Sequence, residues 1–176
     1  MSFAVPEMIA SHFHMRAGDR IADLGAGSGH FTRALSHLVG STGTVFAVDI
    51  QRQLAESITA KARKERLANV ESIWGDLEAI GGTKIADASL DAVLLSNTLS
   101  MIEDKVTTLK ECLRILRRGG KLFIVDWTDS FRGMGPRPDM VLNETEAKKL
   151  LESHGFVLER TFPAGTHHYG LSFRIQ

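Results

Sequence analysis

The chain has 176 residues, which is the length of one domain and leaves no room for a second domain of ordinary size. Hydrophobic residues make up 43% of it and charged residues 24%, a composition that excludes intrinsically disordered and collagen-like proteins. The 21 Lys and Arg residues balance 21 Asp and Glu residues. This zero net charge argues against a protein that binds nucleic acid mainly by neutralising its phosphates.

Apolar spacing and turn residues divide the chain into alternating helices and strands. Helices are predicted at 5–13, 31–39, 54–67, 106–118 and 143–154, with a short irregular or helical piece at 77–80. Strands are predicted at 20–24, 44–48, 70–74, 90–95, 121–125, 156–161 and 169–175. Arg117 and Arg118 are expected in the last turn of the fourth helix, where cations oppose the negative end of the dipole, and Gly119 is expected to end it. Asn143, with Glu146 three residues later, predicts a capping box at the last helix.

Strands that alternate with helices form a parallel sheet with helices on both faces. The last two strands are an exception, because residues 162–168 are too few for a crossover helix and the strands must therefore run antiparallel. We expect an α/β, Rossmann-like fold with a seven-stranded, mostly parallel sheet that ends in an antiparallel β-hairpin. Residues 1–176 are expected to form a single domain. Its predicted parts are an N-terminal helix or lid (1–17), a ligand-binding core (18–126), a lid-like insertion (127–142) and a final helix with the hairpin (143–176).

The chain contains one cysteine, Cys112. One thiol can form neither an internal disulfide nor a thiolate metal cluster, so we expect a reducing, cytoplasmic location, no metal site and a buried structural role for Cys112. No apolar run approaches the ~20 residues that span a bilayer. Residues 1–10 also lack the basic and long apolar regions of a signal peptide.

A glycine-rich turn follows the first predicted strand and leads into a helix, with the pattern D-x-G-x-G-x-G from Asp23 to Gly29. Gly25 permits the tight turn, and Gly27 lets the backbone approach a ligand closely. Gly29 lies at the helix start, where free N–H groups face the ligand. The dinucleotide pattern G-x-G-x-x-G would need a glycine at the sixth position, and His30 stands there instead.

Acidic residues follow the second and third predicted strands. In an open α/β sheet the ligand lies outside the carboxyl ends of the strands, so Asp49 is placed to accept hydrogen bonds from both hydroxyls of a ribose. Asp76 can accept from an exocyclic adenine amine, with Ile50 and Leu77 on the two faces of the base. The plainer alternatives are an acid near a helix start for Asp49 and a turn or N-cap residue for Asp76.

Polar residues also follow the later strands. Ser96 and Asn97 end the fourth strand at the centre of the predicted crevice, where polar groups face the reacting centre; turn chemistry is the alternative. Asp126 ends the fifth strand and is expected to point into the same crevice, and His167 and His168 lie in the hairpin loop. Asp126 and the two histidines are the catalytic candidates, although a structural role is the ordinary expectation for each of them.

These residues resemble the class I S-adenosylmethionine-dependent methyltransferases, in the small-molecule branch related to ubiquinone and menaquinone biosynthesis. The resemblance covers residues 19–175, and it is carried by the turn 23–29, Asp49, the Gly75-Asp76 pair, the segment 90–97 and the final hairpin. It implies the strand order 3-2-1-4-5-7-6. It also implies S-adenosyl-L-methionine as cofactor, S-adenosyl-L-homocysteine as product, and transfer of a methyl group to a small-molecule acceptor.

The resemblance further implies how the cofactor is bound. The backbone of the glycine turn lies against its methionine part, with Asp23 at the amino end, Asp49 at the ribose and Asp76 at the adenine amine. The backbone near Ser96 and Asn97 lines the amino-acid end and the acceptor site. The implied cofactor-binding residues are Asp23, Gly25, Ala26, Gly27, Gly29, Asp49, Ile50, Gly75, Asp76, Leu77, Ser96 and Asn97.

Two differences from related subgroups narrow the range of expected methyl acceptors. Enzymes that methylate DNA base amines and protein glutamine carry an Asn-Pro-Pro-aromatic run after the fourth strand, whereas residues 96–99 contain no proline. Such amines and amides are therefore not expected as acceptors. Related arsenite methyltransferases use several cysteines, which Cys112 alone cannot replace.

Methyl transfer from a sulfonium is an in-line displacement, in which alignment of the nucleophile, the methyl carbon and the sulfur supplies much of the acceleration. A general base is needed only where the acceptor must lose a proton early, so the sequence need not contain a catalytic residue. Acceptor specificity is expected from segments 1–17, 127–142 and 163–168. The middle segment is predicted to be an apolar lid with hinges at Gly133 and Gly135; an ordinary packed loop is the alternative.

Three other functions stay open from the sequence. One is a protein or RNA methyltransferase with an open acceptor site, although the charge balance argues against nucleic acid as a partner. Another is a non-catalytic module that binds S-adenosylmethionine as a sensor or as a partner subunit. The third, a nicotinamide-dependent oxidoreductase, conflicts with the failed dinucleotide pattern.

Overall fold

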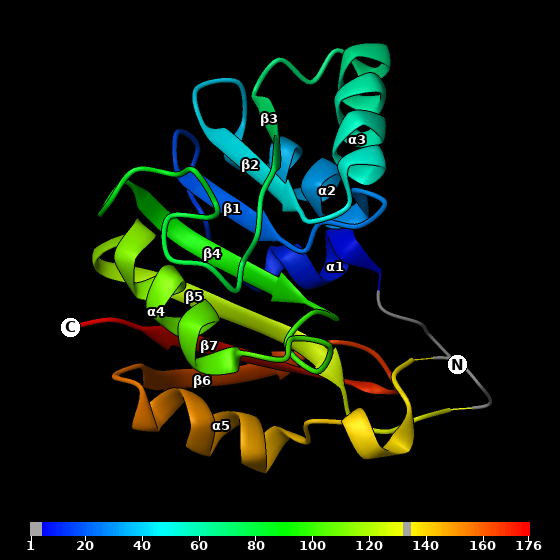
Figure 1. The fold of residues 1–176 in the computed structure, drawn as a ribbon. Helices are drawn as coiled ribbons and strands as arrows, with labels where there is room; N and C mark the ends of the chain where they lie inside the picture. Colours follow the sequence, from blue (N-terminus) through cyan, green and yellow to red (C-terminus); the bar gives the residue numbers. More distant parts are fainter. Residues whose placement is uncertain (1–4, 132–134) are drawn as a thin grey trace.

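The computed structural model describes residues 5–131 and 135–176, which form one seven-stranded sheet with helices around it (Figure 1). The helices are α1 (Pro6–Ser11), α2 (His30–Val39), α3 (Arg52–Glu65), α4 (Lys105–Ile115), the 3-10 helix η1 (Pro138–Met140) and α5 (Glu144–Ser153). The strands are β1 (Arg20–Leu24), β2 (Thr44–Asp49), β3 (Val70–Trp74), β4 (Leu90–Ser96), β5 (Leu116–Trp127), β6 (Val157–Pro163) and β7 (His168–Arg174).

The sheet has the order β3-β2-β1-β4-β5-β7-β6, which confirms the expected order. Strands β1 to β5 run parallel to their neighbours in this series, and β7 lies antiparallel between β5 and β6. The chain moves outward from β1 to β3 and then crosses back to place β4 on the other side of β1 (Figure 1). This reversal creates a crevice at the carboxyl ends of β1 and β4, where open α/β sheets bind ligands.

Apolar side chains form two cores, one on each face of the sheet. Ala22 and Leu24 of β1 belong to the core formed with α4 and α5, whereas Ile21 belongs to the core formed with α1 and α2. Figure 1 shows α4 in front of the sheet and α1 and α2 behind it. Because helices cover both faces, the central strands consist almost entirely of apolar residues, and this explains their continuous apolar runs.

Helix α4 ends at Ile115, so the prediction that it continues to 118 is wrong. Arg117 and Arg118 lie in β5 and not in the last helical turn. The cause is a long-range contact, because Leu116 pairs with Leu90 of β4. Strand pairing therefore ends the helix before the glycines can do so.

Helix α5 begins as predicted. The Asn143 side-chain oxygen accepts a hydrogen bond from the Glu146 N–H (3.0 Å), and the Glu146 carboxylate accepts one from the Asn143 N–H (3.2 Å). These two bonds are the expected capping box. Gly155, with φ of +89°, follows the last turn of α5. The segment 77–83 consists of turns and contains no helix.

Cys112 lies on the buried face of α4 and is fully buried in the core, as expected. Burial, together with the neighbouring charge of Glu111, raises the pKa of its thiol to about 12, so the thiol stays protonated near neutral pH. Among residues 5–131 and 135–176, no helix is long and apolar enough to cross a membrane. Within the same residues, no three His, Cys, Asp or Glu side chains gather as a metal site.

Candidate functional site

A cavity of about 720 Å³ lies at the carboxyl ends of strands β1 to β4, within the range of small-molecule sites. The predicted residues that line it are Asp23, Gly25, Ala26, Gly27, Asp49, Ile50, Asp76, Leu77, Ser96 and Asn97. Gly29 and Gly75 are not among the lining residues. A Cβ at Gly29 would contact Ile58 of α3, and a Cβ at Gly75 would contact Gly82 and Val48, so both glycines allow close packing beside the cavity.

The glycine turn after β1 leaves no room for a side chain at Gly25. The Gly25 N–H donates to the Val48 carbonyl (2.8 Å), and its φ of +74° is a left-handed conformation that favours glycine. A Cβ at this position would lie 2.5 Å from Thr98 Oγ1. At Gly27 the nearest atom to a Cβ would be the Gly25 carbonyl oxygen at 4.0 Å. The space beside Gly27 is therefore open to a ligand.

Asp49 joins the end of β2 to this turn. Its Oδ2 accepts a hydrogen bond from the Gly27 N–H (2.8 Å), and its Oδ1 accepts one from the Gln51 N–H (2.8 Å). The side chain is 5% exposed and lines the cavity. Each oxygen is thus fixed by one backbone donor and keeps a lone pair for a ligand hydroxyl.

Asp23 is a buried carboxylate at the end of β1, 1% exposed. Its Oδ2 accepts a hydrogen bond from the Thr32 hydroxyl of α2 (2.6 Å). Burial raises the pKa of Asp23 to about 6, and the charge of Asp49 acts in the same direction, while the hydrogen bonds from Thr32 oppose the rise. Asp23 is therefore a poorly solvated acid that would gain from a cationic ligand group.

Asp76 lies in a compact turn after β3. Its Oδ1 accepts from the Glu78 N–H (2.8 Å), and its own N–H donates to the Gly82 carbonyl (3.1 Å). Leu77 is buried beside it, whereas Ile50 is 62% exposed, and both line the cavity. This side of the cavity therefore offers a fixed hydrogen-bond acceptor between two apolar side chains.

Asn97 has an unusual backbone and an unsatisfied side chain. Its φ is +54°, and its N–H donates to the Val125 carbonyl of β5 (2.7 Å). Asn97 lines the cavity, and within the described part of the chain its buried Oδ1 has no hydrogen-bond partner. A buried acceptor left without a donor costs free energy, so this atom points to a ligand that carries an N–H or O–H group.

Other cavity residues were not predicted from the sequence. They are Pro6, Ser28, His30, Phe31, Gln51, Leu54, Glu78, Thr98, Met101 and Ile102. Several directly follow the glycine turn or Asp49, and this adjacency is a signal that could have found them. Met101 and Ile102 carry no such signal, because their position depends on how residues 97–104 fold over the end of β4.

Asp126 is fully buried and is not among the residues that line the cavity. Its carboxylate accepts hydrogen bonds from the Ser100 N–H (3.1 Å), the Ser100 hydroxyl (3.0 Å) and the Trp127 N–H (2.8 Å). Burial raises the pKa of Asp126, and these hydrogen bonds oppose the rise. The contacts fix the segment after β4, which carries the cavity residue Met101.

His167 lies in the hairpin loop as predicted, whereas His168 is the first residue of β7 and pairs with Trp127 at the end of β5, so its prediction as a loop residue is wrong. Neither histidine lines the cavity. His167 Nδ1 is 2.9 Å from Asp129 Oδ1, and its ring stacks on Phe131 at 4.0 Å between centroids. The His168 ring lies 4.2 Å from that of Trp127, and burial lowers the pKa of His168. Each histidine has a buried Nε2 that finds no hydrogen-bond partner among the described residues.

The lid-like segment 127–142 is described except for residues 132–134, so the predicted hinge at Gly133 lies outside the described residues. Gly135 has φ of +82°, and a Cβ there would lie 2.7 Å from the Trp127 ring. Farther along, the Leu142 carbonyl accepts a hydrogen bond from the Tyr169 hydroxyl (2.9 Å). The described part of the segment therefore packs against the ends of β5 and β7.

Curated proteins similar to this chain are methyltransferases. An arsenite methyltransferase from Aquipseudomonas alcaligenes is 34% identical over 62% of this chain and 33% of its own length. The ubiquinone/menaquinone biosynthesis C-methyltransferase UbiE from Pseudomonas fluorescens is 32% identical over 65% of this chain and 44% of its own length. This chain therefore spans less than half the length of these two relatives.

A solved structure matches almost the whole fold. The crystal structure of a SAM dependent methyltransferase from Aquifex aeolicus has a TM-score of 0.90 and 28% sequence identity, and the match covers 99% of this chain and 91% of the other. Residues 22–124 match the methyltransferase domain family. This match begins just before the glycine turn, ends in β5 and includes more than half of the 176 residues. The chain therefore belongs to the methyltransferase domain family.

Proposed function

We propose that this chain binds S-adenosyl-L-methionine in the cavity and transfers a methyl group to a small organic acceptor. The observation that carries the proposal is the pair of fixed carboxylates, Asp23 and Asp49, beside an open glycine turn. The family match and the similarity to the Aquifex aeolicus structure support it. When bound, S-adenosyl-L-methionine supplies a methyl group made electrophilic by a sulfonium, and the transfer leaves S-adenosyl-L-homocysteine.

In this proposal different cavity residues bind different parts of the cofactor. The two Asp49 oxygens, each held by one backbone N–H, accept from the two ribose hydroxyls. Asp76 accepts from the adenine amine, and Leu77 and Ile50 cover the faces of the base. Asp23 places its poorly solvated charge against the cationic amino group at the amino-acid end, where an ion pair is worth more than in water.

Asn97 provides a further test of whether the cavity suits S-adenosyl-L-methionine. Asn97 lines the cavity, and its buried Oδ1 lacks a donor among the described residues. The amino group of the amino-acid end can donate to it, which removes the cost of an unsatisfied acceptor. The backbone beside Ser96 then borders the side of the cavity where we place the acceptor.

Catalysis in this proposal comes from alignment more than from proton transfer. A nucleophile held in line with the methyl carbon and the sulfur reacts without the entropic cost of a free encounter. Phe31, Met101 and Ile102 give the cavity an apolar wall. Met101 is 66% exposed, so this wall would exclude water from the reacting groups only when ligands fill the cavity.

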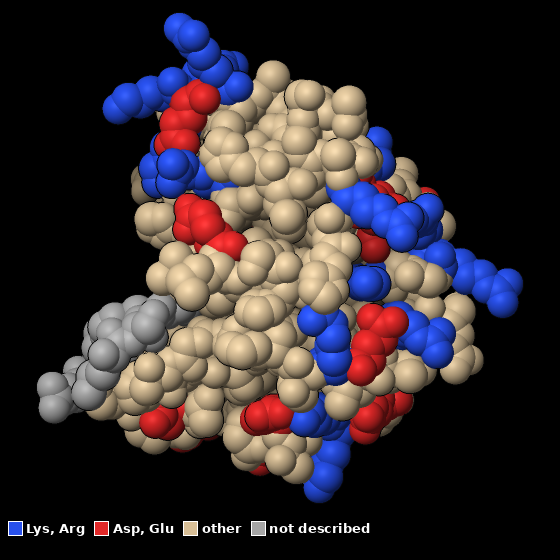
Figure 2. All heavy atoms as spheres, turned by 180° about the vertical axis from the view of Figure 1, so that it is seen from behind, with Lys and Arg blue, Asp and Glu red and all other residues tan. Residues whose placement is uncertain are grey.

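One face of the surface supports a small acceptor over a polymer. Figure 2 shows the face opposite to that of Figure 1, where basic groups are interspersed with acidic ones and separated by uncharged areas. No continuous basic surface crosses that face, whereas proteins that bind RNA commonly have one. An organic acceptor fits better than arsenite, because the one cysteine of the chain is buried.

A proton acceptor is required only for acceptors that lose a proton early. Among the three candidates we assign this role to His167, since its Nδ1 pairs with Asp129. Its Nε2 is buried outside the cavity lining, so this role requires an acceptor that extends from the cavity to the ends of β5 and β7. Asp126 already accepts three hydrogen bonds from Ser100 and Trp127. In this scheme Asp129 stabilises the imidazolium that forms when Nε2 takes the proton.

We also propose that residues 1–176 act as a single domain in the cytoplasm, with segments 1–17 and 127–142 bordering the acceptor. The contacts of α1 support the first border, since Pro6 lines the cavity and Phe13 stacks on Phe123 of β5 at 4.2 Å between centroids. The single buried cysteine is the support for a reducing compartment.

Labelled methyl groups should pass to small molecules. Purified chain is incubated with S-adenosyl-L-methionine tritiated in the methyl group and with fractionated cell extract, and the extract is then separated by ultrafiltration. We expect label in the small-molecule fraction. Label in protein or RNA would favour a polymer acceptor, and binding of S-adenosyl-L-homocysteine without any transfer would favour a non-catalytic module.

Asp49→Ala should weaken the binding of S-adenosyl-L-homocysteine by about 1–3 kcal/mol, because it removes a charged acceptor and frees the Gly27 N–H. Isothermal titration calorimetry measures the change. Glu71→Ala is the control, since Glu71 is an exposed acid on β3 outside the cavity lining. Equal affinities for Asp49→Ala and the unmodified chain would show that the ribose contact is misassigned.

Asp23→Asn should stabilise the ligand-free protein while it weakens cofactor binding. The pKa of Asp23 is raised from 3.8 to about 6 in the folded state, so the native chain loses stability as the pH rises through this window. We expect the variant to have the higher free energy of unfolding at pH 8, by about 1–3 kcal/mol, and no advantage near pH 4. Urea denaturation at the two pH values measures this, and a variant that is less stable at pH 8 would contradict it.

His167→Gln should lower the rate of methyl transfer by on the order of 100-fold for an acceptor with an ionisable O–H or N–H group. The affinity for S-adenosyl-L-homocysteine should not change, because His167 is not a cavity residue. The labelled acceptor found in the extract serves as substrate, and Asp126→Asn is compared in parallel. An unchanged rate in His167→Gln would remove this histidine from the mechanism.

A further inference from the structure

The segment between β3 and β4 carries part of the cavity although it forms neither helix nor strand. Residues 75–89 include Asp76, Leu77 and Glu78, which line the cavity. A segment of this length usually needs contacts outside itself to keep one conformation. Contacts with another part of the molecule must therefore keep the Asp76 carboxylate in place.

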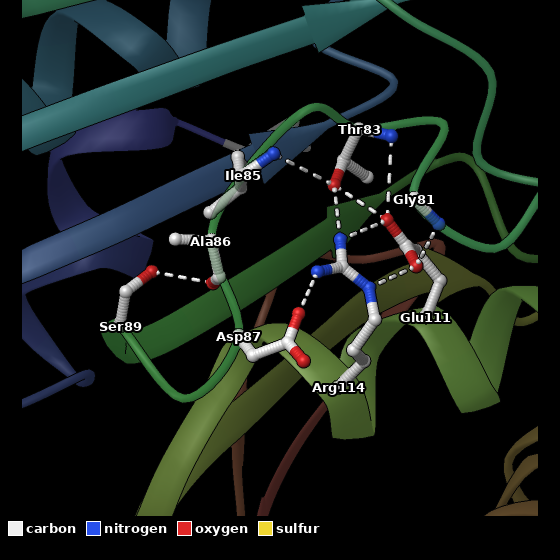
Figure 3. A network of polar contacts seen from close by, with 8 residues as sticks. All are labelled: Gly81, Thr83, Ile85, Ala86, Asp87, Ser89, Glu111 and Arg114. Atoms are coloured by element: carbon white, nitrogen blue, oxygen red, sulfur yellow. Dashed lines mark hydrogen bonds and ion pairs between the residues drawn. The ribbon is translucent and has the colours of Figure 1, made fainter.

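A buried glutamate on α4 binds the middle of this segment (Figure 3). The Glu111 carboxylate is 0% exposed and accepts hydrogen bonds from the Gly81 N–H (2.8 Å) and from the Thr83 hydroxyl (2.6 Å). Arg114, one helical turn later, donates to the same carboxylate through Nε (2.8 Å) and Nη2 (2.7 Å). Arg114 also forms an ion pair with Asp87 near the end of the segment. One Glu–Arg pair thus holds the segment at two points.

The Glu111 carboxylate keeps its charge under ordinary conditions. Burial alone would raise the pKa of Glu111, but hydrogen bonds from Arg114, Thr83 and the Gly81 N–H outweigh it and lower the pKa to about 2. A buried carboxylate with this many donors is rigidly oriented. Its partners on the segment are therefore held at fixed positions as well.

Backbone contacts connect Glu111 to Asp76. Gly81 and Thr83, which bond to Glu111, flank Gly82, and the Gly82 carbonyl accepts from the Asp76 N–H (3.1 Å). The packing around Gly82 is tight, since a Cβ there would clash with the Asp76 carbonyl oxygen. The Asp76 carboxylate is then oriented by the hydrogen bond that it accepts from the Glu78 N–H. A shift of residues 81–83 would consequently move the carboxylate that faces the cavity.

The opposite end of α4 reinforces this arrangement. Glu78 Oε2 accepts a hydrogen bond from the Asp104 N–H (2.6 Å), and Asp104 is the N-cap of α4. The helix therefore contacts the cavity segment at Glu78 through its N-cap and at 81–83 through Glu111. Neither Glu111 nor Arg114 lines the cavity, so any effect they have on a ligand passes through the segment.

We propose that Glu111, together with Arg114, is a positioning residue for the adenine side of the cofactor site. It keeps the turn 76–83 in the geometry in which the Asp76 carboxylate accepts from the exocyclic amine of the base. This inference rests on the proposed function and adds the residue that sets the selectivity for a 6-amino purine over a 6-oxo purine. Loss of Glu111 should therefore lower that selectivity, beyond any effect on folding.

The experiment compares two ligands that differ only at the base. S-adenosyl-L-homocysteine carries the 6-amino group, and S-inosyl-L-homocysteine carries a 6-oxo group that cannot donate to Asp76. Dissociation constants are measured by calorimetry for the unmodified chain, Glu111→Gln, Thr83→Val, Asp76→Asn and the double variant Asp76→Asn/Glu111→Gln. Asp87→Asn is the matched control, since Asp87 belongs to the same network but is 78% exposed and does not contact the turn 76–83 in it.

We expect the unmodified chain to prefer the adenosyl ligand by at least tenfold, and Glu111→Gln and Thr83→Val to reduce this preference at least threefold. Asp87→Asn should keep the full preference, and Glu111→Gln should have no further effect once Asp76 is changed. Melting temperatures are recorded for every variant, and Thr83→Val supplies the answer if Glu111→Gln does not fold.

Two outcomes separate the inference from the function on which it rests. An unmodified chain that binds neither ligand would overturn the proposed function and this inference with it. A chain that binds with the expected preference, and keeps that preference in both Glu111→Gln and Thr83→Val, would overturn only the inference. Lower melting temperatures with an unchanged preference would then assign Glu111 to the stability of the fold alone.

Discussion

The end of β2 determines the shape of the glycine turn after β1. The turn has few side chains with which to hold itself, and the backbone donors at its start bond to the Val48 carbonyl, while the Gly27 N–H bonds to Asp49. The parallel pairing of β1 with β2 brings these groups to the same level. Thr98 then closes the turn from the β4 side, where Gly25 has no room for a Cβ. Every other feature of the cavity is arranged around a backbone that two neighbouring strands keep fixed.

Two buried carboxylates in this domain have opposite pKa shifts, and the difference separates their roles. Asp23 has a pKa raised to about 6, chiefly by burial, with Thr32 as its hydrogen-bond donor. Glu111 is equally hidden from solvent, but hydrogen bonds from Arg114, Thr83 and Gly81 lower its pKa to about 2. A fully paired buried charge fixes structure, whereas a poorly paired one is at its most stable only with a ligand. On the proposed function, the buried charge of Asp23 lowers the stability of the ligand-free domain and raises its affinity for the cofactor.

Local sequence patterns were enough to predict the parts of the site that lie at strand ends. Asp49 and Asp76 follow strands of a predictable parallel sheet, so their meeting at one edge follows from topology alone. Asp126 satisfies the same rule, yet it is buried against Ser100, a contact that no local pattern encodes. Glu111 was missed because its partners lie about 30 residues upstream in an irregular segment, although an acid next to Cys112 at the spacing of the buried face of α4 was a signal. The early end of α4 has a similar cause, since strand pairing of Leu116 with Leu90 overrides helix propensity.

The sheet has a parallel half, which includes β3, β2, β1 and β4, and a half that contains the antiparallel hairpin of β6 and β7. The two halves contribute differently to the cavity. Among the described residues, the half from β3 to β4 supplies all the strand-end residues that line the cavity, so on the proposed function substitutions there weaken the binding of the methyl donor. The hairpin half places His168 beside Trp127 at the end of β5, where the Thr128 N–H donates to the His167 carbonyl (2.8 Å). On the proposed function, the second half can therefore differ in length and composition, to suit another acceptor, without disturbing the residues that line the cavity in the first half. Such modularity is a physical reason why one scaffold can serve a chemically diverse family.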